Sequence, residues 1–166
     1  MPFNRRPKAI KLDYRVKLTD SPDRIRQTGF SKVSTVLGRD MPEMVVILQQ
    51  RKENADGSIT AKRVGTQIYK FTQSTNGWVE GKTFDIMYGD ITKHPGYTKR
   101  MDLMRGDATI YARNSKGENG PVDENGWTDA SATPTHAIVK FDSSHGGAYI
   151  GSIGTTLWLD NIKWVY

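Results

Sequence analysis

The chain has 166 residues, an apolar fraction of 36% and a net charge of +6, which fit one globular domain and exclude a disordered chain. The absence of cysteine excludes disulfide scaffolds, thiol catalysis and cysteine–zinc sites, and no apolar run approaches a membrane-spanning length. Residues 1–52 carry 12 Lys and Arg against 5 Asp and Glu, whereas residues 53–166 carry 12 against 13. This asymmetry indicates either a solvated basic surface or a face that attracts an acidic partner.

The first predicted strand, residues 9–18, has the clearest pattern in the chain. Apolar residues alternate there with Lys11, Arg15 and Lys17, so one face of the strand is apolar and the other is charged. No signal peptide precedes this strand, which indicates a domain excised from a larger protein. Residues 19–42 read as a long, irregular, basic connection.

The middle of the chain predicts four more strands. Residues 44–48 are continuously apolar, as in a strand covered on both faces. Residues 54–57 are a turn signal, and residues 58–64 are the returning strand of a hairpin. Residues 67–72 and 83–88 are expected to form two further strands.

The second half of the chain alternates strands with long polar segments. Residues 89–101 predict a polar connection, residues 108–113 a strand, and residues 114–133 a long loop rich in Gly and Pro. Residues 139–166 predict three strands separated by Gly-rich turns. No segment has a helical period, so about eight to eleven short strands predict an all-β sandwich or barrel.

Both ends of the chain carry a recognisable pattern. It consists of Pro2-Phe-Asn-Arg-Arg-Pro7, the strand ending in Asp13-Tyr14, Phe141-Asp-Ser-Ser144, Gly151-Ser152, Leu157-Trp-Leu-Asp160, Ile162 and Tyr166. The pattern resembles the carbohydrate metabolism domain family of Bacteroidota surface proteins, a jelly-roll family similar to carbohydrate-binding modules. Asp142 and Leu159 depart from the serine and the valine of the family's ending without disturbing the strands.

The resemblance implies an antiparallel β-sandwich with jelly-roll topology, formed by residues 1–166 as a single domain of a secreted or cell-surface protein. It also implies non-catalytic binding of a polysaccharide or oligosaccharide in glycan utilisation, by a monomer that requires no cofactor. A glycoside hydrolase or lyase on the same fold, or a structural or adhesive domain, are the alternatives. Nucleic acid is not an expected partner, because the basic residues and the free aromatic residues lie in different parts of the chain.

Sugar-binding proteins stack exposed aromatic rings on the apolar face of a pyranose and bond its hydroxyls with polar side chains. The candidate ligand-binding residues are Trp127, Trp78, Tyr97, Arg100, Trp158, Arg15 and Asp129. Trp127 leads this set because it lies in the Gly- and Asp-rich segment expected to be a loop. Each tryptophan could instead pack in the core. The charged face of the first strand adds the expectation that acidic glycans are preferred.

Metal and catalytic sites have weaker signals. The resemblance makes Asp160 a candidate ligand of a structural Ca²⁺, and the alternative is that its carboxylate accepts a hydrogen bond from a neighbouring turn. No motif selects a pair of carboxylates for glycoside hydrolysis. His94, His136 and His145 lack metal-ligand spacing. No catalytic residue is therefore predicted.

Overall fold

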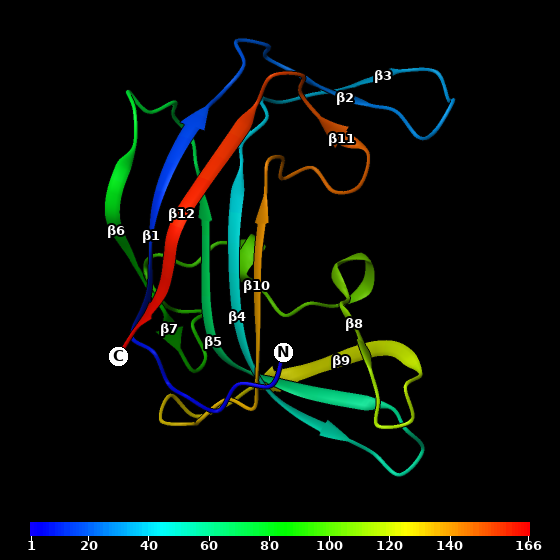
Figure 1. Ribbon diagram of the computed structural model, residues 1–166. Helices are drawn as coiled ribbons and strands as arrows, with labels where there is room; N and C mark the ends of the chain where they lie inside the picture. Colours follow the sequence, from blue (N-terminus) through cyan, green and yellow to red (C-terminus); the bar gives the residue numbers. More distant parts are fainter. The chain divides into compact units, whose positions relative to one another are not determined.

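The computed structural model describes all 166 residues, Met1 to Tyr166. It contains twelve β-strands, two short 3₁₀-helices, η1 (Lys99–Met101) and η2 (Gly106–Ala108), and no α-helix (Figure 1). The all-β prediction is therefore confirmed, with several antiparallel sheets. The jelly-roll order of the strands stays a prediction.

The chain divides into two compact units, and each is built from distant parts of the sequence. Unit 1 comprises Met1–Pro7, Val46–Gln67 and Ile86–Val139. Unit 2 comprises Lys8–Val45, Ile68–Asp85 and Lys140–Tyr166. Because both units mix early and late segments, neither is a contiguous half of the chain.

Unit 1 is organised around a six-stranded sheet. Its strands are β4 (Glu43–Glu53), β5 (Ile59–Lys70), β7 (Met87–Tyr88), β8 (Tyr111–Arg113), β9 (Asn119–Trp127) and β10 (His136–Asp142), of which β4, β5 and β10 contain residues of both units. The strand order is β10-β4-β5-β9-β8, with β7 paired to β5. The pair β5–β9 is parallel, which the expected antiparallel sandwich does not include. Apolar residues of β4 form the core here, and Val46, Ile47 and Leu48 are completely buried.

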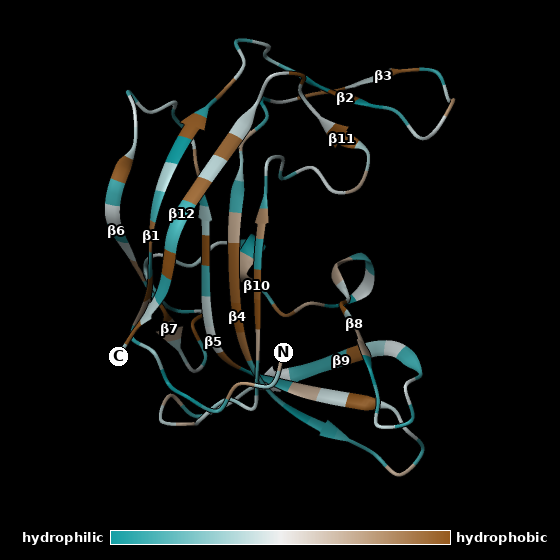
Figure 2. Ribbon diagram, in the orientation of Figure 1, coloured by the Kyte–Doolittle hydropathy of each residue, from teal (hydrophilic) through white to brown (hydrophobic).

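Unit 2 contains two three-stranded sheets. Their strands are β1 (Ala9–Lys17), β2 (Arg24–Arg26), β3 (Ser34–Val36), β6 (Val79–Asp85), β11 (Ile150–Gly151) and β12 (Thr156–Val165). One sheet has the order β12-β1-β6 and the other β11-β2-β3. Figure 2 shows hydrophobic and hydrophilic residues alternating along β1 and β12. Alternation buries one face of β1, so that Ile10, Leu12 and Val16 are each at most 1% exposed.

An aromatic cluster completes the core of unit 2. Tyr14 of β1 lies 4.9 Å from Phe71 between ring centroids, and Tyr69 lies 4.8 Å from Phe84 of β6. Tilted pairs at these distances add stabilisation beyond burial alone. The inward side of β1 is thus fixed by packing, which directs its charged residues to the opposite face.

Four sequence predictions about elements were wrong in detail. The two strands expected at 58–64 and 67–72 are one strand, β5, and the strand expected at 83–88 is divided between β6 and β7. The expected loop at 114–133 contains the nine-residue strand β9, and the connection at 19–42 contains β2 and β3. Polar segments of this kind show no apolar alternation, and they become strands through pairing with neighbours distant in sequence.

Candidate functional site

The exposed face of sheet β12-β1-β6 gathers several of the predicted site residues. We call it the β1 face and define it by Lys11, Asp13, Arg15 and Lys17 of β1 with their neighbours in β12 and β6. Arg15 and Lys17 are exposed, whereas Ile10, Leu12 and Val16 on the other side of β1 are buried and Tyr14 is half-buried. The period of two in a strand therefore places the charged side of β1 outward.

An aromatic and cationic row crosses this face. Arg15 pairs with Trp158 of β12 in the antiparallel register, and its Cζ lies 5.1 Å from the centroid of the Trp158 ring. Tyr14 pairs with Val79, so the same register puts Trp78, which directly precedes β6, beside Arg15. Trp158 is 38% exposed and Trp78 47% exposed. Three predicted residues from distant parts of the chain thus form one row on the β1 face.

Asp13 holds two β-bulges, one on each side of β1. The pairing slips by one residue beside Asp13 in both β12 and β6. Asn161 and Gly81 adopt positive φ angles of 51° and 61° at these slips. Asp13 Oδ1 accepts a hydrogen bond of 2.5 Å from the Gly81 backbone N–H, and its Oδ2 accepts one of 2.6 Å from Asn161 Nδ2. These two bonds, followed by the charges of Lys11 and Lys163, lower the pKa of Asp13.

A polar cleft lies beside the bulges on the same face. It has a volume of about 460 Å³ and is lined by Lys11, Asp13, Glu80, Gly81, Asn161 and Lys163. Ammonium and amide groups supply hydrogen-bond donors there, and carboxylates and the amide oxygen supply acceptors. The β1 face therefore combines exposed aromatic rings with a groove that can bond hydroxyl groups in both directions.

Asp160 lies on the β1 face, opposite Asp13 in the register. It is exposed, and its Oδ1 accepts a hydrogen bond of 2.7 Å from the backbone N–H of Asn161. No group of three or more His, Cys, Asp or Glu side chains is arranged to hold a metal ion. Ca²⁺ takes six to eight oxygen ligands, and Asp160 Oδ1 is here engaged by the Asn161 N–H. Calcium binding at Asp160 stays a prediction.

The remaining predicted site residues lie in unit 1. Trp127 ends strand β9 and is half-buried, so the prediction that it lies in a loop was wrong. Arg63 Cζ lies 5.4 Å from the centroid of its ring, which gives Trp127 a packing role. Asp129 Oδ1 accepts hydrogen bonds from the backbone N–H and the hydroxyl of Ser131 at 2.8 and 2.6 Å, as a turn residue does.

Tyr97 and Arg100 lie in the segment around η1 and are both half-buried. Burial, followed by the charge of Asp102 and a hydrogen bond with it, raises the pKa of Tyr97. These two residues belong to unit 1 with Trp127 and Asp129. Trp158, Arg15 and Asp160 belong to one sheet of unit 2, and Trp78 directly precedes a strand of that sheet. The predicted set therefore separates into two groups.

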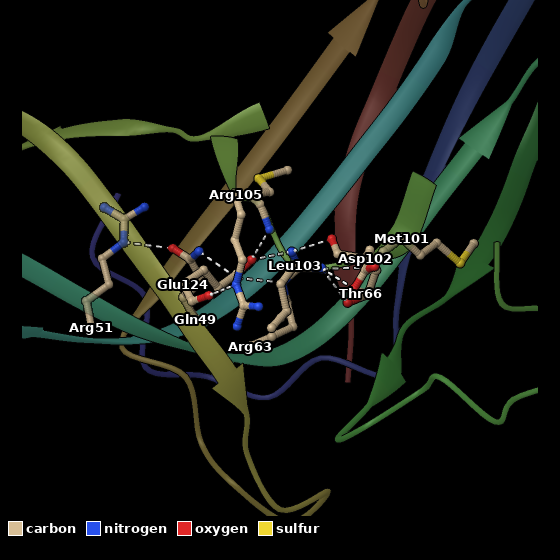
Figure 3. A network of polar contacts seen from close by, with 10 residues as sticks. Gln49, Arg51, Arg63, Thr66, Met101, Asp102, Leu103, Arg105 and Glu124 are labelled. Atoms are coloured by element: carbon tan, nitrogen blue, oxygen red, sulfur yellow. Dashed lines mark hydrogen bonds and ion pairs between the residues drawn. The ribbon is translucent and has the colours of Figure 1, made fainter. Parts of the chain in front are cut away.

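Sequence reasoning missed a buried polar network in unit 1, which Figure 3 shows from close by. The side chains of Arg63 in β5 and Glu124 in β9 are fully buried, and Arg63 Nε and Nη2 donate to the two oxygens of Glu124 at 2.7 and 2.6 Å. Glu124 also accepts hydrogen bonds from Gln49 Nε2 and the Met104 backbone N–H. Arg63 donates further bonds to Thr66, Met101 and Asp102. Every buried polar side-chain atom of the chain has a partner.

Electrostatics in this network favour the ionised pair. Burial raises the pKa of Glu124, but hydrogen bonds and the charge from Arg63 outweigh that effect, so the pKa is lowered overall. The sequence feature that could have predicted this ion pair is the position of each charged residue within its strand. Arg63 alternates with Ile59 and Ala61 on the buried side of β5, and Glu124 lies two residues after the buried Val122. Opposite charges at inward positions of two strands predict a buried ion pair.

Comparisons with protein-family models, curated proteins and solved structures found no match for this chain. No helix has the length and apolarity that crossing a bilayer requires.

Proposed function

We propose that the protein is a non-catalytic polysaccharide-binding module whose ligand lies on the β1 face. The observation that carries this proposal is the row of Trp78, Arg15 and Trp158 beside the polar cleft at Asp13. The resemblance of both chain ends to a jelly-roll family of Bacteroidota surface proteins supports it. Jelly-roll topology and a location at the cell surface are part of the same proposal.

The chemistry of the face suits a sugar polymer. The C–H face of a pyranose is apolar and stacks on an exposed indole, whereas its rim of hydroxyls needs donors and acceptors together. Trp158 and Trp78 offer the indoles, and the cleft at Asp13 offers both kinds of polar group. The strand rise of about 3.3 Å separates Arg15 from Lys11 by about 13 Å, so the face is long enough for more than one sugar unit.

Acidic glycans are the proposed preference, because Arg15 and Lys17 are exposed cations at the tryptophan end of the face. An arginine can bond a uronate carboxylate through two parallel hydrogen bonds. At the other end, Lys11 and Lys163 lie near Asp13, which reduces their contribution. We therefore expect a mild preference for acidic polymers, with affinity falling as salt rises.

A glycoside hydrolase at this face is the weaker alternative. Hydrolysis needs one carboxyl group with a raised pKa to protonate the leaving oxygen. The pKa of Asp13, which lines the cleft, is lowered instead, and both of its oxygens accept hydrogen bonds. Asp13 is thus suited to holding the bulges and unsuited to acting as a general acid.

The test is isothermal titration calorimetry with a neutral and a uronate-rich polysaccharide at low and high salt. Trp158→Ala and Trp78→Ala should each weaken binding by about 1–3 kcal/mol and leave the melting temperature nearly unchanged. Tyr111→Ala is the matched control, since Tyr111 is an aromatic residue of unit 1 that is 65% exposed. If Tyr111→Ala weakened polysaccharide binding and neither tryptophan variant did, the binding site would lie in unit 1. No binding of any polysaccharide would leave a structural or adhesive role.

A further inference from the structure

A second feature of unit 1 is a cleft bordered by both edges of its sheet. The end strands of the order β10-β4-β5-β9-β8 are β10 and β8. One cleft of about 910 Å³ is lined by residues of both strands and one residue before β8, namely 110–113 and 136–139. Edge strands present backbone N–H and C=O groups that can pair with another chain. The cleft therefore offers backbone groups as well as side chains.

The edge of β10 already accepts a short strand at its beginning. The Met1 amine donates to the Ala137 carbonyl and the Ala137 N–H donates to the Met1 carbonyl, each at 3.0 Å. The Phe3 N–H donates to the Thr135 carbonyl at 2.8 Å, and Pro2 and His136 form an antiparallel bridge. Backbone groups alternate sides along a strand, so Val139 is the next residue of β10 that faces this edge.

The cleft walls define the side chains that would fit. Ile110, Ile138 and Val139 make part of the lining apolar, and the exposed Tyr111 stands at the same cleft. Arg51 and Arg113 also line it, and no carboxylate does. Arg51 Nε donates to Gln49 Oε1 at 2.9 Å, which fixes one guanidinium at the cleft. Apolar walls with two arginines suit an occupant that alternates apolar and polar residues and also carries acidic residues.

We propose that this cleft binds an extended peptide segment of a partner protein, with alternating small apolar and polar residues and acidic residues at its ends, as an antiparallel strand added to β10 beyond Ala137. Main-chain hydrogen bonds to the edge would hold the segment, and pockets for alternate side chains would select it. A glycan fits less well, because much of the lining is apolar. A second copy of this chain also fits less well, since pairing two β10 edges would bring the arginines of both copies together.

The probe is the acetylated, amidated peptide EVTVTVE, titrated into the full chain by calorimetry. We expect saturable binding, slower hydrogen exchange of the Val139 amide, and no binding of KVTVTVK or of the proline-interrupted EVTPTVE. Val139→Pro should weaken binding about tenfold or more, because it removes the edge donor while the sheet tolerates proline at an edge. Arg113→Glu should weaken it about tenfold through charge reversal.

Trp158→Ala is the matched control, because Trp158 lies in unit 2 and its loss should leave peptide binding unchanged. If Val139→Pro does not fold, EVTVTVE methylated at every backbone nitrogen from its first valine to its last supplies the test on the unchanged protein, because no donor can then face β10. Equal affinity would overturn the proposal. Three other results would also overturn it. The first is that EVTVTVE does not bind. The second is that the protein binds a uronate polymer but no peptide, and that Arg113→Glu abolishes this binding. The third is that the protein forms a dimer that Val139→Pro abolishes.

Discussion

At the scale of single residues, Asp13 organises the β1 face. Its two carboxylate oxygens hold the bulges at Gly81 and Asn161, and a Cβ atom at Gly81 would lie 3.0 Å from Lys11 Cε. The positive φ of Gly81 therefore favours glycine, whereas the contact with Lys11 involves the end of a flexible side chain that can move away. The shape of the polar cleft depends on this one carboxylate.

We predict that Asp13→Ala weakens polysaccharide binding, although Asp13 is not part of the tryptophan row, because both bulges lose their acceptor. Its lowered pKa means that the ionised form stabilises the fold fully above about pH 4, and that this stabilisation is lost as pH falls through the lowered value. Calorimetric titration and melting curves between about pH 2 and 6 check both effects. An unchanged affinity would show that the cleft does not contact the ligand.

Trp127 carries the opposite prediction. The sequence suggested that Trp127→Ala weakens glycan binding, whereas the contact with Arg63 and the half-buried ring favour packing. We expect Trp127→Ala to reduce the free energy of unfolding by about 1–3 kcal/mol and to leave glycan affinity unchanged. Denaturant unfolding and calorimetry measure the two quantities separately. Unchanged stability with reduced affinity would restore Trp127 to the binding site.

At the scale of elements, the ion pair of Arg63 and Glu124 joins β5 to β9. Glu124→Gln should reduce the free energy of unfolding by about 3–5 kcal/mol, because the Arg63 charge then remains buried without its counter-charge. Asp123→Asn, at the neighbouring exposed position of β9, is the matched control and should have little effect. Equal losses for the two variants would mean that the pair does not stabilise this strand pairing.

The segment between β10 and β12 is held by a second polar contact. His145 Nδ1 lies 3.2 Å from the Met41 carbonyl and 3.9 Å from the buried Asp40, which also accepts the Ser152 N–H at 2.8 Å. Burial, with the charges of Lys70 and Arg24, lowers the pKa of His145. The folded state therefore favours the neutral imidazole.

This contact predicts a pH dependence of stability. The unfolded chain binds more protons below about pH 6.5, so stability is full above that pH and falls as pH decreases through the lowered pKa of His145. The pKa of His136 is lowered in the same direction by burial and Arg51, so each histidine should contribute. Melting curves of His145→Gln and His136→Gln between about pH 5 and 8 separate them. A wild-type melting temperature independent of pH would contradict both.

At the scale of the whole molecule, a structural calcium ion would appear as a change in melting temperature. An ion bound by the folded state alone stabilises it by mass action. Because Asp160 Oδ1 accepts the Asn161 N–H and no cluster of carboxylates is arranged to hold a metal, we expect equal melting curves in chelator and in millimolar calcium. A lower melting temperature in chelator, abolished by Asp160→Ala, would establish the calcium site.

The distribution of charge in the folded molecule also differs from its distribution along the sequence. The basic excess is N-terminal in the sequence, but each of the two units contains twelve Lys and Arg and nine Asp and Glu, a net charge of +3 in both. Folding thus distributes a charge that the sequence concentrates. A preference for acidic ligands has to come from local sets, such as Arg15 with Lys17 or Arg51 with Arg113, and not from the N-terminal third as a whole.

The sequence by itself determined the all-β class, the apolar strand at 44–48, and which side of β1 is buried. These features depend on local periodicity, because side chains alternate with a period of two whatever the partner strand. The tertiary structure decided the strand formed by residues 119–127, the ion pair of Arg63 with Glu124, and the meeting of Arg15 with Trp158. Those features depend on pairing and register between segments far apart in the chain, which no local pattern encodes.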